Sequence, residues 1–200
     1  IKPPLGTDAR RALVEVPVAE QLLVLRGIVD RQVRNLVFKG INWQGNQWLL
    51  GPEGRMFYQA EADLDGAIAL SHAQGVSFEK CSVSHTGTYA VEIGENCQQI
   101  EVRRCSLTDL GAGGIKIGLM RRATNPDQAT GQIVVADSVI AGYGRLHPAA
   151  VGVWIGHSAD NAIVRNAIQD GYYTGISVGW SWGYGDSGAH HNRIEDNNIS

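Results

Sequence analysis

Several features that mark common protein classes are scarce or absent in this chain of 200 residues. It has three cysteines, no CxxC pair and no His-rich ligand spacing, so a structural zinc site is not indicated. HExxH and Walker sequences are absent, and we expect neither a metal nor a cofactor. His190 and His191 are adjacent and are interpreted as residues of a loop tip; on a strand they would point in opposite directions and form a poor chelate.

Long apolar runs and a basic surface are also missing. No run of 18 apolar residues occurs, so we expect no membrane-spanning helix. The formal net charge is −3, and Lys and Arg are scattered along the sequence rather than gathered in a stripe. Because a phosphate-tracking surface needs clustered positive charge, we expect no nucleic-acid partner.

An internal repeat is the most informative feature that is present. Five segments share a triplet in which two apolar residues flank a variable one. Such alternation predicts short strands with one buried face, and its recurrence predicts a solenoid rather than a domain around one central core. The triplets are Ile68-Ala69-Leu70, Val91-Glu92-Ile93, Ile115-Lys116-Ile117, Val153-Trp154-Ile155 and Ile176-Ser177-Val178.

A second apolar pair returns later in most units, with its two ends five residues apart and a Cys or Asn at the same position between them. These middle residues are expected to stack in one column at a turn, where Asn hydrogen-bonds the backbone and tolerates left-handed geometry. They are Cys81, Cys105, Asn166 and Asn197. With about 20 to 24 residues per coil, the sequence predicts an all-β, right-handed parallel β-helix whose coils rise about 4.8 Å. A leucine-rich horseshoe is disfavoured because its LxxLxLxxN register is absent. We expect the cysteines to be buried, unpaired thiols.

The whole chain, residues 1–200, is predicted to form a single β-helix domain of about six coils. Residues 46–66 and 119–131 break the repeat and are predicted to be loop insertions. The chain begins at Ile1 and stops at Ser200, one residue after an apolar position that should enter another strand. Because a solenoid needs capped ends, we expect a fragment of a longer β-helix, truncated at both ends.

Ligand contacts are expected on the outer wall, because the interior of a β-helix is packed. On the first strand of each unit the outward positions include Glu92, Lys116 and Trp154. Small residues beside them are expected to leave room for a ligand against the sheet; these are Gly114, Gly152 and Gly175.

The corner that closes each unit holds a second column, formed by His85, Asp109, Gly142 and Asp170. Glycosidic bond cleavage normally uses two carboxyl groups roughly 5 to 10 Å apart. Asp109 and Asp170 would lie two coils apart, about 10 Å between backbones, so they are a predicted catalytic pair. Two other readings stay open: Asp109 is only a turn former, or Asp170 pairs with a carboxylate beyond Ser200.

Residues 170–185 are rich in aromatic side chains separated by Gly and Ser. Exposed aromatic rings on a rigid sheet are what flat sugar faces stack on. The predicted sugar platform comprises Trp154, Tyr172, Tyr173, Trp180, Trp182 and Tyr184, with His85, His157, Glu92 and Lys116 orienting hydroxyl groups. The alternative is a loop folded over its own aromatic side chains.

The segment from Asp170 to Gly185, followed by His191-Asn192-Arg193-Ile194, resembles secreted bacterial right-handed β-helix proteins of the glycoside hydrolase family 141 type. Earlier stretches agree, namely Leu23 to Gly27, Val33 to Leu36 and Phe78 to Gly87, so the resemblance spans most of residues 17–200. It implies a pair of aspartates near the C-terminal coils and cleavage of plant cell-wall glycans. Asp170 matches the first aspartate, and the second is expected shortly after Ser200. A secreted or periplasmic location is expected from this function.

Two other function classes stay open. A polysaccharide lyase or epimerase would use Lys116, Arg121 or Arg122 to abstract a proton, although no acidic calcium cluster accompanies them. A non-catalytic glycan-binding, adhesin or phage-spike solenoid would use the same aromatic face without competent carboxylates.

Overall fold

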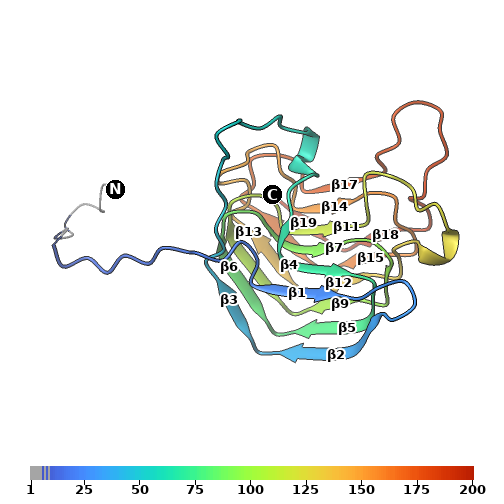
Figure 1. Cartoon of the computed structure of the whole chain (residues 1–200), viewed down its shortest axis with the longest axis horizontal. Helices are drawn as coiled ribbons and strands as arrows, with labels where there is room; N and C mark the ends of the chain where they lie inside the picture. The colour runs from blue at the N-terminus through green and yellow to red at the C-terminus, as the bar shows by residue number, and fades with distance from the viewer. Residues whose placement is uncertain (1–5, 7, 9) are drawn as a thin grey trace.

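The computed structural model describes residues 6, 8 and 10–200, and its strands wind into three parallel sheets (Figure 1). Each of six successive coils contributes one strand to each sheet, and strands pair only with the coil before and the coil after. Every strand pair is parallel. The all-β parallel β-helix predicted from the repeat is confirmed.

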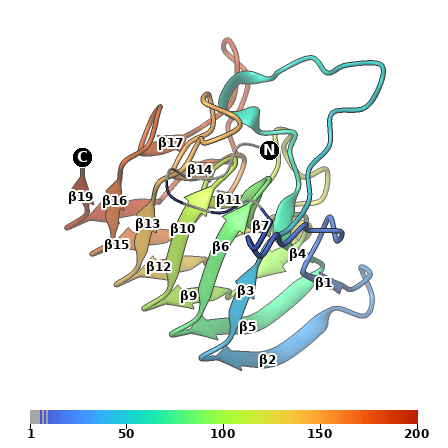
Figure 2. The ribbon, with the colours of Figure 1, turned by 90° about the vertical axis from the view of Figure 1, so that its left-hand side faces the viewer.

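Sheet 1 contains the first strand of each coil: β1 (Leu23–Arg26), β4 (Gly66–Ser71), β7 (Tyr89–Ile93), β11 (Ile115–Ile117), β14 (Val153–Ile155) and β17 (Ile176–Val178). Sheet 2 contains β2 (Val33–Lys39), β5 (Ala73–Glu79), β9 (Glu101–Arg103), β12 (Val134–Ala136), β15 (Ala162–Val164) and β18 (Arg193–Glu195), with β8 (Cys97–Gln98) beside β5. Sheet 3 contains β3 (Asn42–Gln44), β6 (Ser82–Thr86), β10 (Ser106–Leu110), β13 (Val139–Ala141), β16 (Ala167–Gln169) and β19 (Asn198–Ile199), and Figure 2 shows these strands side by side.

The core fills the space between the three sheets with the apolar residues of the repeat. Ile68, Ile93, Ile115 and Ile155, all from sheet 1, are fully buried in one continuous cluster. The prediction that the first and third residues of a triplet point into the core is therefore confirmed for these four isoleucines.

The glycines beside the sheet 1 strands serve this core and leave no room for a ligand. A Cβ on Gly114 would lie 2.5 Å from Cγ2 of Ile140. The same clash recurs one coil on, where a Cβ on Gly152 would lie 2.6 Å from Cγ2 of Ile168. The prediction that these glycines make room on the outer wall is wrong, because sheet 3 isoleucines occupy that space from within.

A ladder of hydrogen bonds holds the turn between sheets 2 and 3. Oδ1 of Asn166 accepts a hydrogen bond from the Ser138 amide at 3.0 Å, and its Nδ2 donates to the Val135 carbonyl at 2.9 Å. The Asn166 amide in turn donates to Oδ1 of Asn197 at 3.0 Å. The predicted column is confirmed, but the left-handed residue is the one before it, such as Arg165 with φ 53°. Cys81, Cys97 and Cys105 are buried free thiols, as predicted.

Long connections emerge mainly around sheet 1. Residues 45–65, with the 3-10 turn η1 (Gln59–Glu61), connect β3 to β4. Residues 118–133, with η2 (Pro126–Gln128), connect β11 to β12, and residues 179–192 connect β17 to β18 (Figure 1). Among the described residues, no helix is long and apolar enough to cross a membrane.

Candidate functional site

The closing corner between sheets 3 and 1 carries the predicted column. Ser84, Thr108, Ala141 and Gln169 are register partners in β6, β10, β13 and β16. The residues that follow them therefore lie one above another: His85, Asp109, Gly142 and Asp170. All four have left-handed φ values, 54° at both aspartates. The shared backbone geometry aims these side chains outward at one corner.

Each aspartate of this column has one cationic or imidazole neighbour. Nδ1 of His85 lies 2.5 Å from Oδ2 of Asp109, and Nη2 of Arg145 donates to Oδ2 of Asp170. The Arg145 guanidinium also lies over the Tyr172 ring, 5.6 Å from its centroid. Both aspartates keep more than half of their side-chain surface in solvent. The corner is thus an open polar surface with an aromatic ring at its edge.

The aromatic segment divides into two groups at opposite ends of β17. Tyr172 and Tyr173 are exposed just before the strand. Trp182 is 77% exposed and Tyr184 fully exposed in the loop that follows it. Trp180 is partly buried between Trp182 and the outer wall. These rings form two separate patches and not a single platform.

Trp154 is not part of a sugar platform. It is 1% exposed, packed under Ala60 and Ala62 of the 45–65 connection, and its ring centroid lies 5.4 Å from that of Trp180. The prediction of an exposed ring is wrong because an insertion far away in sequence covers this stretch of sheet 1.

Lys116 and Glu92 are also engaged by protein partners at this part of sheet 1. Nζ of Lys116 donates to the carbonyls of Ala62, at 3.2 Å, and Leu64, and lies 3.1 Å from Oε1 of Glu92. The second Glu92 oxygen accepts from the Gly66 amide at 3.0 Å. The prediction that Lys116 and Glu92 orient sugar hydroxyls is therefore wrong, and Lys116 is not free to act as a lyase base.

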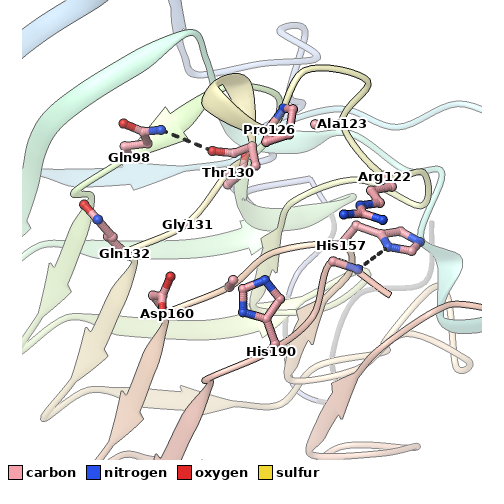
Figure 3. Close-up of a pocket in the computed structure, with 13 residues that line it drawn as sticks. Gln98, Arg122, Ala123, Pro126, Thr130, Gly131, Gln132, His157, Asp160 and His190 are labelled. Carbon is pink, nitrogen blue, oxygen red and sulfur yellow. Dashed lines mark hydrogen bonds between the residues drawn. The ribbon is translucent and has the colours of Figure 1, made fainter. Parts of the chain in front are cut away.

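His157 lies at a different corner from the two aspartates. It follows β14, between sheets 1 and 2, and lines a cavity of about 300 Å³ (Figure 3). Its Nδ1 accepts from the Gly188 amide at 3.0 Å, and burial together with the positive charge of Arg122 lowers its pKa. The structure therefore separates His157 from His85, Asp109 and Asp170.

Two hollows share Gln21 and Asp65, which sequence analysis missed; one lies at the start of the first sheet 1 strands and the other on the outer wall of that sheet. One, of about 270 Å³, is lined by Glu20, Trp48, Arg55, Asp63 and Asp65 among others. The second, of about 200 Å³, lies beside it and is lined by Asp65 again, with Arg26, Glu92 and Glu95. We call the two hollows together the Asp65 groove.

The carboxyl groups of the Asp65 groove differ in their surroundings. Burial, and next the negative charge of Glu92, raise the pKa of Asp65, while Lys116 opposes the change. Asp65 nevertheless keeps an exposed face. Asp63 is held on both oxygens by Arg55, at 2.5 and 3.3 Å. An accessible carboxyl group that stays protonated to higher pH can donate a proton to a leaving group.

Asp65 and Trp48 were missed because the 45–65 connection has no repeat to align. A usable signal was nevertheless present: Glu61, Asp63 and Asp65 alternate with apolar residues immediately before β4. Asp63 and Asp65 are exposed there, whereas Glu61 is buried against Arg55.

One short sequence, Gly179-Trp180-Ser181-Trp182-Gly183, has the G-x-S-x-G spelling of a hydrolase nucleophile turn. No helix follows it, and Oγ of Ser181 donates to the main-chain oxygen of Asp186 at 3.3 Å. Because the nucleophile turn requires a strand, a tight turn and a helix, the match is one of spelling only.

Comparison with known proteins gives one structural relative. No protein-family model matches the chain, and no curated protein matches it. A solved structure described as "Glycoside hydrolase" aligns with a TM-score of 0.69 and 20% identity, covering 88% of this chain. This chain spans 38% of that protein's length. At this identity the likeness shows the shared β-helix fold.

Proposed function

We propose that this β-helix is the substrate-binding part of a glycoside hydrolase, with Asp65 as the proton donor to the leaving sugar. The observation that carries the proposal is an accessible carboxyl group with a raised pKa at the junction of two hollows. Glycosidases raise the pKa of one carboxyl group so that it remains an acid at working pH. The structural relative described as a glycoside hydrolase supports the same class.

The walls of the groove suit a sugar. Trp48 lines the hollow beside Glu20 and Arg55, and its ring is held edge-to-face against His147, with 4.4 Å between the ring centroids. Sugars bind where an aromatic face is combined with a few hydrogen-bonding groups. A hollow continued along sheet 1 by the second cavity suits an oligosaccharide or polysaccharide, consistent with plant cell-wall or related glycans.

Glu20 is the partner carboxylate in this proposal. It lines the same hollow as Asp65, and its negative charge contributes to raising the pKa of Asp65. The alternatives are already engaged: Asp63 holds Arg55, and both oxygens of Glu92 have protein partners. Glu20 therefore acts as the base or nucleophile, and Glu92 as a positioning residue behind Asp65.

The exposed corner pair of Asp109 and Asp170 is the competing assignment for the same reaction. Both side chains are accessible, and Tyr172 lies beside Arg145 at their edge. Substitution distinguishes the two sites, because they lie at different places on the outer wall.

The test measures turnover of aryl glycosides and cell-wall oligosaccharides by the protein and by matched Asp→Asn variants. Asp65→Asn is expected to lower kcat by roughly 10²- to 10⁴-fold, the usual contribution of a general acid. The exposed Asp186→Asn serves as the control and is expected to retain activity. If Asp170→Asn abolishes turnover and Asp65→Asn does not, the corner column is the reaction centre. Glycan binding without product in every variant would select the non-catalytic class.

The pH profile gives an independent check on Asp65. A general acid must be protonated, so activity falls as pH rises through its pKa. Glu92→Gln removes a negative neighbour and leaves the Lys116 charge uncompensated, and both changes lower the pKa of Asp65. The alkaline limb of kcat against pH is expected to move to lower pH. An unmoved limb would rule Asp65 out as the acid.

The proposal includes a secreted or periplasmic location, since polymeric glycans lie outside the cytoplasm. Fractionation of cells that express the full-length protein would check it. The lyase alternative is weakened by the buried, fully bonded Lys116, and absence of unsaturated products in the same assays would exclude it.

A further inference from the structure

Three potential metal ligands converge at the corner between sheets 1 and 2, away from the Asp65 groove. Asp160, His190 and His191 each offer one ligand atom, and these atoms all lie within 4.8 Å of one another. The two Nδ1 atoms are 3.0 Å apart, and Nδ1 of His191 lies 3.7 Å from Oδ1 of Asp160. Two ligand atoms of a tetrahedral zinc ion, each about 2.05 Å from the metal, lie about 3.4 Å apart. The observed distances bracket that value.

The backbone explains why adjacent histidines converge here, contrary to the expectation for a strand. His191 has φ 53°, and β18 begins only at Arg193, so the two rings do not alternate across a sheet. Their centroids lie 4.9 Å apart. The poor chelate predicted from strand geometry is therefore not the geometry observed.

The two ligand-bearing segments are also tied together. The Asp160 amide donates to the His190 carbonyl at 3.1 Å. The next residues form a ladder rung, in which Nδ2 of Asn161 donates to Oδ1 of Asn192 at 2.8 Å. Because the ligands sit directly on this rung, little ordering is needed to bring them together, and preorganisation favours affinity.

A hydrogen bond between the two imidazoles would account for their 3.0 Å separation alone. The Asp160 carboxylate adds a third group: its Oδ1 lies 3.7 Å from Nδ1 of His191, beyond hydrogen-bond distance but within the range of an ion pair or of a shared metal ion. Three neutral or anionic ligand atoms within 4.8 Å of one another form an arrangement that a bound cation would stabilise.

We propose that Asp160, His190 and His191 bind a divalent zinc ion at the rim of the 300 Å³ cavity. Figure 3 shows Asp160 and His190 at this cavity. Two imidazoles and one carboxylate suit zinc and related transition metals, whereas calcium and magnesium prefer all-oxygen sites. With three protein ligands, the ion keeps a position for water or another ligand. Asp160 and His190 line the cavity together with Arg122, whose positive charge favours an anionic occupant.

Titration calorimetry with zinc chloride on the full chain tests the site. The protein is expected to bind one zinc ion, and His191→Ala and Asp160→Asn are each expected to weaken binding by roughly tenfold or more, about 1.4 kcal/mol. His190→Ala/His191→Ala is expected to abolish it. His85→Ala is the matched control, because His85 is an exposed histidine beside a single carboxylate, and it is expected to leave zinc binding unchanged.

Copper substitution provides a readout that misfolding does not imitate. The paramagnetic resonance spectrum of the Cu²⁺ form is expected to show two coupled nitrogens, and one after His191→Ala. Thermal melting without metal is expected to be unchanged in all variants, since the three side chains are exposed. Zinc affinity equal in the double-histidine variant and the parent protein, or lost equally in His85→Ala, would overturn the assignment.

Discussion

We expect the polar interactions of the buried Lys116 ammonium to be the main ones that hold the 45–65 connection against sheet 1. Its side chain is 6% exposed, and it bonds two carbonyls of the connection and the 17%-exposed Glu92. Lys116→Met keeps most of the side-chain volume but leaves Glu92 and two carbonyl oxygens without that donor. Removing one partner of a buried ion pair costs about 3–5 kcal/mol, and the partial exposure of Glu92 puts this site near about 3 kcal/mol.

The size of the effect can be measured by urea unfolding and melting. A loss of about 3 kcal/mol corresponds to a fall of about 6–12 °C in Tm for a chain of this length. The double variant Lys116→Met/Glu92→Gln removes both charges and is expected to recover about 2 kcal/mol as a coupling energy. Lys39→Met is the control, since that lysine is largely exposed, and it should not shift Tm measurably.

Amide hydrogen exchange shows which part of the chain is destabilised by Lys116→Met. Amides of residues 45–65 are expected to exchange faster in Lys116→Met, while those of β12 and β15 keep their protection. A coupling energy below about 0.5 kcal/mol, or unchanged exchange in the connection, would refute the claim that Lys116 holds the connection against sheet 1.

Three further predictions concern stability. Trp154→Ala should lower the free energy of unfolding by about 3–5 kcal/mol, because it empties a fully buried site, whereas Trp182→Ala at an exposed site should leave it unchanged; urea titration compares them. Asn166→Ala should cost about 1–3 kcal/mol by leaving the Ser138 amide unpaired in the ladder, again measured by urea. His147 is fully buried, and burial and then the charge of Arg55 lower its pKa. The unfolded chain then binds more protons, so stability should fall as pH drops below about 6.5, and His147→Phe should make that decline shallower in unfolding measured at pH 7.5 and 5.

The positions that recur in every coil were predicted well from the sequence. The outer members of the first four triplets are buried, whereas in the fifth Ile176 is partly buried and Val178 is exposed. The turn column of Cys81, Cys105, Asn166 and Asn197 forms as predicted. The offsets that put His85, Asp109 and Asp170 in one column match the strand register. A repeat encodes such placements because each coil copies the hydrogen-bonding and packing of the one before it.

Side chains on the outer wall were placed poorly. Trp154 and Lys116 occupy outward positions, yet the 45–65 connection buries both. Asp65 escaped notice because it belongs to that connection, which aligns with no other unit. His190 and His191 converge only because of a left-handed residue between strands.

The sequence by itself therefore determined the coil, its three strands, its turn ladder and the face that each repeated residue presents, since these follow from local period and from contacts between successive copies. Tertiary structure alone decided which outward positions meet solvent, which carboxyl groups lie together and which histidines converge. The path of a non-repeating connection depends on long-range packing, and no local pattern specifies that packing.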